Sequence, residues 1–155
     1  MTKLDPPPVL DCARVLAYAV VDESVIYSER GCLFVDGNLL GPVPRLAICQ
    51  NLRETEIMIF HCDNELNVLG VAGAHSSVQN AKTAAERSYR GISNKWVDAS
   101  VTEDEAREFL KLEFSGEECS FCGRWPFEVG QMIAKGNLRI CAKCVCEFHE
   151  IVHKV

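Results

Sequence analysis

The sequence lacks the features that mark membrane-spanning, secreted and nucleotide-hydrolysing proteins. No apolar run approaches the ~18 residues that a membrane helix needs. The opening residues, MTKLDPPPVLD, carry no basic flank before an apolar core, so we expect no secretory signal and a cytoplasmic location. The phosphate-binding pattern G-x-x-x-x-G-K-[ST] is also absent. We therefore expect a cytoplasmic protein that is neither embedded in a membrane nor an ATPase of this type.

Positive charge is also in short supply. The chain has 16 Lys and Arg against 22 Asp and Glu, a net charge of −6. Residues 1–114 contain 11 basic and 17 acidic residues and account for the whole excess, whereas residues 115–155 contain five of each. Nucleic-acid binding normally needs a basic face. We predict no nucleic-acid partner, although Lys135, Arg139 and Lys143 form a small basic edge.

Nine cysteines in 155 residues would indicate disulfides in a secreted protein. In a reducing cytosol, thiols stay free or bind metal. Four of the nine are scattered through the first half, mostly in apolar stretches, and we expect them to be small buried hydrophobes. These are Cys12, Cys32, Cys49 and Cys62.

The hydrophobic pattern of residues 12–114 predicts an α+β domain, a mostly antiparallel sheet with two helices against one face. Three consecutive prolines favour a flexible tail over residues 1–11. A hairpin is expected over 32–42, because Asp36-Gly37 is a turn signal between apolar stretches. The other expected strands are 14–21, 45–49, 56–62, 67–73 and 95–99, with a second hairpin joining 56–62 to 67–73.

Two helices complete this domain in the prediction. The first follows Ser76, which with Gln79 fits a capping box, and Gly91 stands where a C-terminal cap belongs. The second spans 102–114, with Thr102 as the N-cap and Glu105 as its capping-box partner. A short polar joint then leads to a separate module, residues 115–155.

Two C-x2-C pairs separated by eighteen residues predict a zinc site in this module. Zn(II) prefers four tetrahedral ligands, and two cysteines at i and i+3 can bind one ion from a single tight turn. Gly123 suits that turn because glycine tolerates positive φ. A shell filled by four thiolates is typical of a structural site, since a catalytic zinc keeps a position open for water. We predict one zinc per chain, held by Cys119, Cys122, Cys141 and Cys144.

Cys146 and His149 lie close enough in sequence to act as substitute ligands, but we expect both on a final helix that does not touch the metal. That helix, 145–152, places Val145, Phe148 and Val152 on one stripe, which can cover the spacer between the cysteine pairs or a partner, and we expect it to cover the spacer. We also expect Trp125 and Phe127, in the spacer, to make exposed or intermolecular contacts, because so small a module cannot bury every large side chain.

The module resembles the C4 zinc-binding domain at the start of ClpX, the substrate-recognising unfoldase of the Clp protease system. The shared residues are CSFCG at 119–123, Glu128-Val129, Ile133-Ala134, Ile140-Cys141, Cys144-Val145 and Ile151-Val152. The resemblance implies a treble-clef-like fold, one zinc, self-association and a docking surface for proteins. The second pair is C-A-K-C, where the family usually has acidic residues, and Trp125-Pro126-Phe127 replaces a more polar run.

The first domain shows no convincing catalytic motif. His61-Cys62-Asp63 is the most suggestive cluster, but neighbouring strand residues point to opposite faces, so His61 and Cys62 cannot meet. The serines after His75 are explained by helix capping. We therefore predict a protein without enzymatic activity.

Two functions remain open from the sequence. The first is a protein-interaction module, an adaptor or regulator that docks a protein partner or a second copy through the zinc module. The alternative is an immunity protein that neutralises a bacterial toxin through its acidic N-terminal domain, because a small acidic protein can block a basic nuclease by charge complementarity.

Overall fold

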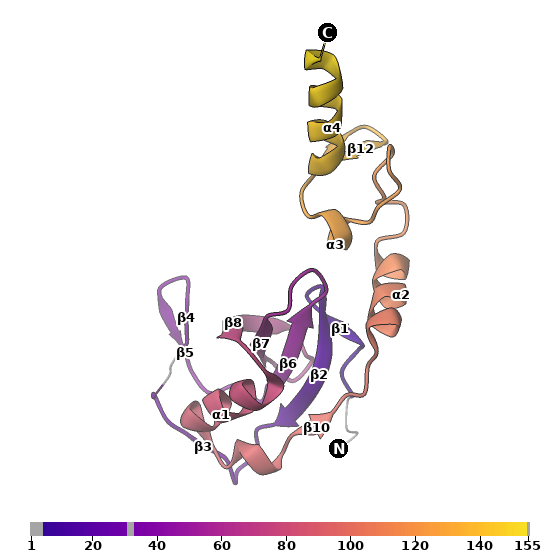
Figure 1. The fold of residues 1–155 in the computed structure, drawn as a ribbon. Coiled ribbons are helices and arrows are strands. Elements are labelled where there is room, and N and C mark those ends of the chain that lie inside the picture. Colours follow the sequence, from indigo (N-terminus) through magenta and orange to yellow (C-terminus); the bar gives the residue numbers. More distant parts are fainter. Residues whose placement is uncertain (1–4, 31–32, 155) are drawn as a thin grey trace. The chain divides into compact units, whose positions relative to one another are not determined.

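A computed structural model describes residues 5–30 and 33–154 and divides the chain into two compact units, residues 1–106 and 107–155 (Figure 1). Helix α2, Glu103–Glu113, contains the division. The predicted division, after residue 114, lies just beyond the end of this helix. Cys32, expected to be buried, lies outside the described residues.

The first unit is built on an antiparallel sheet with the strand order β1-β2-β6-β7-β8 and with β10 also paired to β2. The β2–β6 pair has one register shift and the β7–β8 pair has two, and bulges of this kind bend strands and increase local twist. The sheet consequently curls into half a barrel (Figure 1). Its strands are β1 Val9–Leu10, β2 Ala13–Val20, β6 Arg45–Asn51, β7 Ile57–Cys62, β8 Val68–His75 and β10 Val97–Asp98.

The expectation of a flexible tail over residues 1–11 is wrong for its last residues. Val9 and Leu10 pair with Arg14 and Ala13 of β2, and both are buried. The three prolines end just before this strand, and the carbonyl of Pro8 accepts a hydrogen bond from Val15 N–H at 3.0 Å. A proline lacks the N–H donor but keeps its carbonyl, so it can still lead a chain into a sheet.

The expected hairpin forms from β4, Leu33–Val35, and β5, Asn38–Leu40. Its two turn residues have positive φ, 51° at Asp36 and 79° at Gly37, as a two-residue turn between twisted strands requires. The hairpin packs against β8 at Gly70, where an added Cβ would lie 2.8 Å from Leu33 Cδ2. Gly70 therefore leaves the space that the hairpin side chains occupy.

Helix α1, Val78–Ser88, is capped one residue later than the sequence indicated. Ser77 is the N-cap, and its hydroxyl accepts from Asn80 N–H at 3.1 Å. The hydroxyl of Ser76 instead accepts from the Asn80 side chain at 2.7 Å. Gly91, with φ 95°, is not the helix cap but opens a 3-10 turn, Ile92–Asn94. Between these helices, β9, Tyr89–Arg90, pairs with β3, Ile26–Tyr27.

The core of this unit lies on both faces of the sheet, because alternate residues of a strand point to opposite faces. On β6, Leu46 and Ile48 pack on the face covered by α1, while Ala47 and Cys49 pack on the other. Ala81 and Ala85 are buried contacts of α1 with the first face. Their small side chains let the helix approach the sheet closely.

Helix α2 begins as predicted. The Thr102 hydroxyl accepts from Glu105 N–H at 3.2 Å, and the Glu105 carboxylate accepts from Thr102 N–H at 2.8 Å, which is a capping box. Ala106 and Leu110 are fully buried. Among the described residues, no helix has both the length and the apolar character needed to cross a membrane.

The second unit continues from α2 into a short helix, a two-stranded ribbon and a final helix. The N–H of Trp125 donates to the Glu128 carboxylate at 3.0 Å at the start of the short helix, and Pro126 occupies its first turn, where a missing N–H costs nothing. These elements are α3 Pro126–Val129, β11 Met132–Lys135, β12 Leu138–Cys141 and α4 Ala142–His153.

Candidate metal centre

The first cysteine pair forms a tight turn whose backbone bonds to itself. The N–H of Gly123 donates to the carbonyl of Cys119 at 2.8 Å, and the N–H of Cys119 donates to the carbonyl of Arg124 at 2.8 Å. Gly123 has φ 70°, as its expected role in the turn requires. This turn places the side chains of Cys119 and Cys122 on the same side, although Cys122 is exposed and Cys119 is buried.

The second pair belongs to the junction of a strand and a helix. Cys141 ends β12, where it pairs with Met132 of β11, and Cys144 lies in the first turn of α4. The helix begins at Ala142, earlier than the predicted residue 145, so it contains the fourth cysteine. A helix N-terminus carries partial positive charge and stabilises a nearby thiolate.

Hydrogen bonds join the two pairs. The N–H of Ser120 donates to the carbonyl of Arg139 at 2.8 Å, and the Ser120 hydroxyl accepts from Arg139 N–H at 3.0 Å. The Arg139 guanidinium donates to the carbonyl of Gly116 at 2.9 Å. Arg139, which the sequence placed on a basic edge, therefore ties the strand before Cys141 to the turn before Cys122.

The sulfur positions fit a tetrahedral zinc site. Zn–S bonds of about 2.3 Å place the sulfurs of a tetrahedral shell about 3.8 Å apart. The Cys119–Cys144 and Cys122–Cys141 Sγ–Sγ distances are both 3.8 Å. All four sulfur atoms lie within 4.8 Å of one another. This set is Cys119, Cys122, Cys141 and Cys144, as the spacing predicted.

The electrostatics of the four thiols also call for a cation. Burial raises the pKa of Cys119, but bonds from the backbone N–H groups of Cys122, Phe121 and Cys141 outweigh it and lower the pKa to about 6. Burial raises the pKa of Cys144, and the neighbouring thiol groups raise it further. Four thiolates this close repel one another, and a dication bound among them removes that repulsion.

A comparison with known protein families supports a zinc site in this part of the chain. Residues 117–154 match the ClpX C4-type zinc finger. The match ends there: no family model matches the N-terminal unit. No curated protein and no solved structure matches the chain. The treble-clef arrangement that the resemblance implied is present, since the turn of the first cysteine pair, the β11–β12 ribbon and α4 surround the four sulfurs. The finger holds one Zn(II) per chain through Cys119, Cys122, Cys141 and Cys144.

Cys146 and His149 lie on α4 and are exposed, and neither belongs to the sulfur cluster. The His149 ring instead lies 4.3 Å from that of His153. Both residues lie on the final helix, as expected, and outside the group of four sulfur atoms.

The aromatic side chains of the spacer are arranged differently from the expectation. Phe127 is buried, not exposed, and its ring lies 6.4 Å from Phe114 at the end of α2. Trp125 is half-buried and stacks on Phe127 at 6.3 Å. The prediction of an exposed Phe127 is wrong because Phe114, outside the cysteine-bounded segment, supplies a packing partner.

The stripe on α4 is also not the cover that the sequence indicated. Val145 and Phe148 are 38% and 40% exposed, and Val152 is 68% exposed. The Phe148 ring meets that of Phe121, which lies between Cys119 and Cys122, with the ring centres 5.2 Å apart and the planes at 81°. The buried residue of α4 is instead the metal ligand Cys144, in its first turn.

The His61-Cys62 pair behaves as expected. His61 lies on the α1 side of the sheet near Tyr89, with the ring centres 6.0 Å apart, whereas Cys62 is buried in the opposite core cluster with Cys49. Burial is the main cause that raises the pKa of both thiols, so these cysteines are neutral hydrophobic side chains. Cys12 is only half-buried and occupies the turn between β1 and β2.

Proposed function

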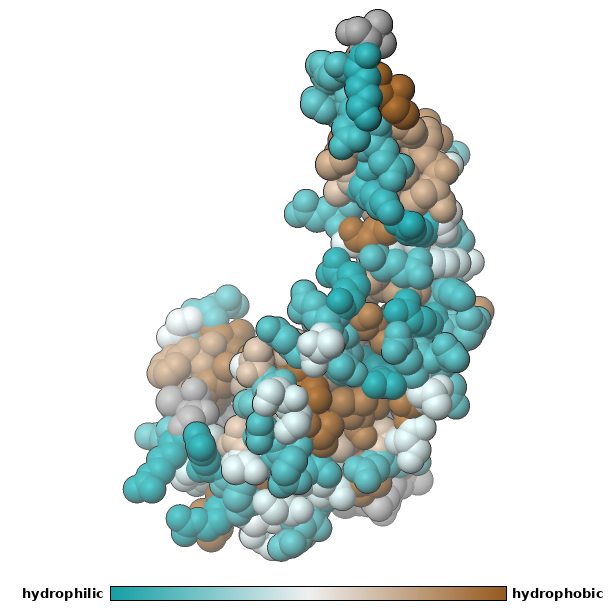
Figure 2. All heavy atoms as spheres, in the orientation of Figure 1, coloured by the Kyte–Doolittle hydropathy of each residue, from teal (hydrophilic) through white to brown (hydrophobic). Residues whose placement is uncertain are grey.

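We propose that the zinc finger is a protein-docking module and that the chain acts as a non-enzymatic adaptor or regulator. The observation that supports it most is an exposed apolar surface, the α4 face, which we define as Phe121, Val145, Phe148, Ile151 and Val152. The exposed fractions of these side chains run from 38% to 68%. In Figure 2, brown and tan side chains lie along one flank of α4 and teal side chains along the other.

The spacing along α4 makes this surface continuous. Positions 145, 148 and 152 recur every three or four residues, which places them on one side of a helix, and position 151 lies beside them. Phe121 extends the surface onto the first cysteine pair through its contact with Phe148. Contiguous exposed apolar residues on a small unit are typical of binding surfaces.

The metal centre suits a structural role in this proposal. Its four protein ligands fill a tetrahedral shell, whereas catalytic zinc sites keep a position for water. The zinc therefore fixes the geometry of α4 relative to the first cysteine pair. We also propose that the partner is a protein, either a second copy or another chain, and neither a nucleic acid nor a membrane. The immunity alternative remains a prediction that no structural observation favours.

The test is a pair of double variants of the full zinc-loaded chain. Phe148→Ser with Val152→Ser removes two members of the α4 face, and Glu147→Ser with Glu150→Ser changes the charged side of the same helix. Sedimentation equilibrium measures self-association. If the chain dimerises through this face, the first variant should weaken the dimer at least tenfold, because aromatic anchors carry much of an interface's energy, while the control should not.

A monomeric result directs the test to another protein. A photo-crosslinking residue at position 152 should then capture a defined partner in the source cell, and one at position 150 should not. The proposal fails if the chain is monomeric and both positions give the same products. It also fails if the first double variant loses zinc, since the α4 face would then be part of the folded core.

A further inference from the structure

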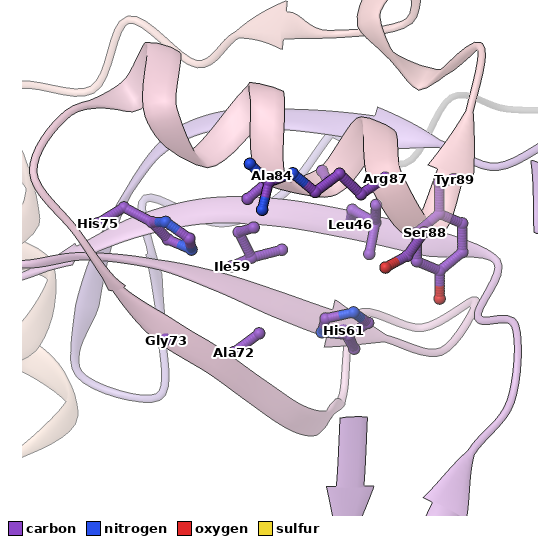
Figure 3. Close-up of a pocket in the computed structure, with 11 residues that line it drawn as sticks. Leu46, Ile59, His61, Ala72, Gly73, His75, Ala84, Arg87, Ser88 and Tyr89 are labelled. Atoms are coloured by element: carbon purple, nitrogen blue, oxygen red, sulfur yellow. The ribbon is translucent and has the colours of Figure 1, made fainter. Parts of the chain in front are cut away.

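A pocket of about 200 Å³ opens in the first unit between α1 and the strands β7 and β8 (Figure 3). Nothing in the zinc finger contributes to it, because all its lining residues lie between positions 46 and 89. Leu46, Ile59, Ala72 and Ala84 form apolar walls, and Tyr89 closes one end. An apolar cavity of about 150 Å³ is large enough to hold a benzene ring. The pocket therefore has room for an aromatic ring with one small substituent.

His61 provides a buried polar group in this apolar setting. Its side chain is 8% exposed and lines the pocket from β7. Within the described part of the chain, its Nδ1 atom has no hydrogen-bond partner. Burial lowers the pKa of His61, with the Ile59 carbonyl opposing this in part. A buried polar atom without a hydrogen-bond partner costs free energy. A ligand that forms a hydrogen bond with His61 would remove that cost.

A second imidazole and a guanidinium lie at other points of the same pocket. His75, at the end of β8, has a buried Nε2 atom that likewise finds no hydrogen-bond partner among the described residues. Arg87 extends from α1 over the pocket (Figure 3). No described carboxylate forms an ion pair with its guanidinium, and none lines the pocket.

Glu86, the acidic residue next to Arg87 in the sequence, forms its hydrogen bonds outside the pocket. Glu86 accepts from Gly91 N–H at 2.7 Å and from Ser93 N–H at 2.9 Å, and these bonds lower its pKa. It is therefore held in the loop after α1 and does not neutralise the pocket. Among the described residues, Arg87 therefore brings a positive charge with no carboxylate partner to a pocket that also holds two imidazoles with unpartnered nitrogen atoms.

We propose that this pocket binds a small monocarboxylic acid with a compact aromatic or similarly apolar body. The carboxylate bonds to Arg87 and to an imidazole, and the apolar body fills the space between Leu46, Ile59 and Ala84. A charge-assisted bond of this type is stronger than a neutral one. The site is on the N-terminal unit and is independent of the docking function proposed for the zinc finger.

Other ligand classes satisfy fewer of these groups. A purely apolar molecule leaves Arg87 and His61 without partners. Inorganic phosphate satisfies Arg87 but leaves the apolar walls unfilled. A structural zinc ion needs four ligands, and His61 and His75 are the only residues of a zinc-binding type in the described lining.

The experiment is a titration of the full, zinc-loaded, isotope-labelled chain followed by two-dimensional NMR. The probes are benzoate, the neutral benzamide of nearly the same shape, and inorganic phosphate. Benzoate should give saturable shifts at residues of the pocket, with a dissociation constant of ~1 mM or tighter. Benzamide should bind at least about tenfold more weakly, because it lacks the charge that Arg87 recognises.

Two charge variants give matched controls. Arg87→Gln should weaken benzoate binding about tenfold, since it removes a charge-assisted bond. Arg90→Gln removes an equal charge from an exposed residue outside the pocket lining and should leave binding unchanged. Ala84→Leu, a substitution that suits a helix, should block the pocket, with the NMR spectrum of the free variant reporting whether it folds.

Several outcomes would overturn the proposal. Benzamide binding as tightly as benzoate would show that charge is not recognised, and equal losses in the two arginine variants would show only a general electrostatic effect. Saturation with phosphate alone would indicate a simple anion site. Failure to saturate with benzoate at tens of millimolar, well beyond the expected ~1 mM, would show that the pocket does not take this class of ligand.

Discussion

Different interactions stabilise the two units of this chain. In the first, the fully buried side chains are those of a sheet protein, among them Leu46, Ile48 and Tyr89. In the second, three of the buried residues are the metal ligands Cys119, Cys141 and Cys144, and the partly buried Val129, Met132 and Ile140 pack against them. Hydrophobic burial stabilises the first unit, whereas the second depends on metal binding.

Each unit is therefore expected to be sensitive to a different perturbation. A protein with one continuous core responds as a whole to a core mutation or to metal loss. Here each perturbation should act on one unit. The sequence provides a reporter for each, because the chain has two tryptophans, Trp96 in the first unit and Trp125 in the second. Trp125→Phe and Trp96→Phe give single-tryptophan chains that follow the units separately.

Removal of zinc is expected to have the largest effect. Structural zinc sites contribute roughly 10–16 kcal/mol of apparent binding free energy at neutral pH, and the second unit has too little apolar core to replace it. A strong chelator should unfold residues 117–154 and leave the sheet intact. The measurement is the fluorescence of each single-tryptophan chain, with zinc content determined by elemental analysis.

The cysteines offer a matched control for this prediction. Cys141→Ser removes a buried ligand and should abolish stoichiometric zinc, whereas Cys146→Ser changes an exposed thiol on α4 and should retain it. If the Trp96 signal changes together with that of Trp125 on chelation, the two units are not independent. Less than half an equivalent of zinc in freshly purified protein would contradict the metal assignment itself.

Truncation of the sheet core should have the next largest effect. Leu46 is fully buried, and replacing a buried leucine by alanine costs about 2–5 kcal/mol in lost burial and cavity formation. Leu46→Ala should lower the urea midpoint reported by Trp96 and leave zinc content unchanged. The control is Leu69→Ala on β8, where the side chain is 40% exposed and the loss should be much smaller. Similar losses from both variants would mean that the sheet core is not where the structure places it.

The smallest expected effect is the change of the first unit's stability with pH, which arises from protonation of His61. Its pKa in the folded protein is lowered, mainly by burial, while in the unfolded chain it is about 6.5. The unfolded state therefore takes up the proton first. Stability is complete above about pH 6.5 and falls as the pH decreases toward the lower pKa of the folded state. Urea midpoints from Trp96 should be lower at mildly acidic pH, and His61→Asn should reduce this slope. An unchanged slope in that variant would assign the effect to other groups.

Local signals predicted most of the elements. The hairpin at Asp36-Gly37, the capping box of Thr102 and Glu105, and the strands of residues 14–21 and 45–49 are all present. Each depends on residues that are close in sequence, so spacing and side-chain type are sufficient to indicate it.

The features that the sequence did not predict depend on contacts between residues far apart in the chain. Val9 and Leu10 form a strand because β2 is there to pair with them. Phe127 is buried because Phe114 lies beside it. The pocket gave no sequence signal at all, since His61, His75 and Arg87 come from two strands and a helix that only the folded chain brings together.

The zinc ligands could be predicted from sequence alone, because two C-x2-C pairs at this spacing are typical of a four-thiolate zinc site. The sequence also determined the fold class, since strand and helix periodicities are local properties. Which side chains are buried and which remain exposed for binding depends on the packing of the folded chain. The exposure of the α4 face and the lack of partners for the polar groups of the pocket depend on which residues surround them. Those neighbours come from distant parts of the chain.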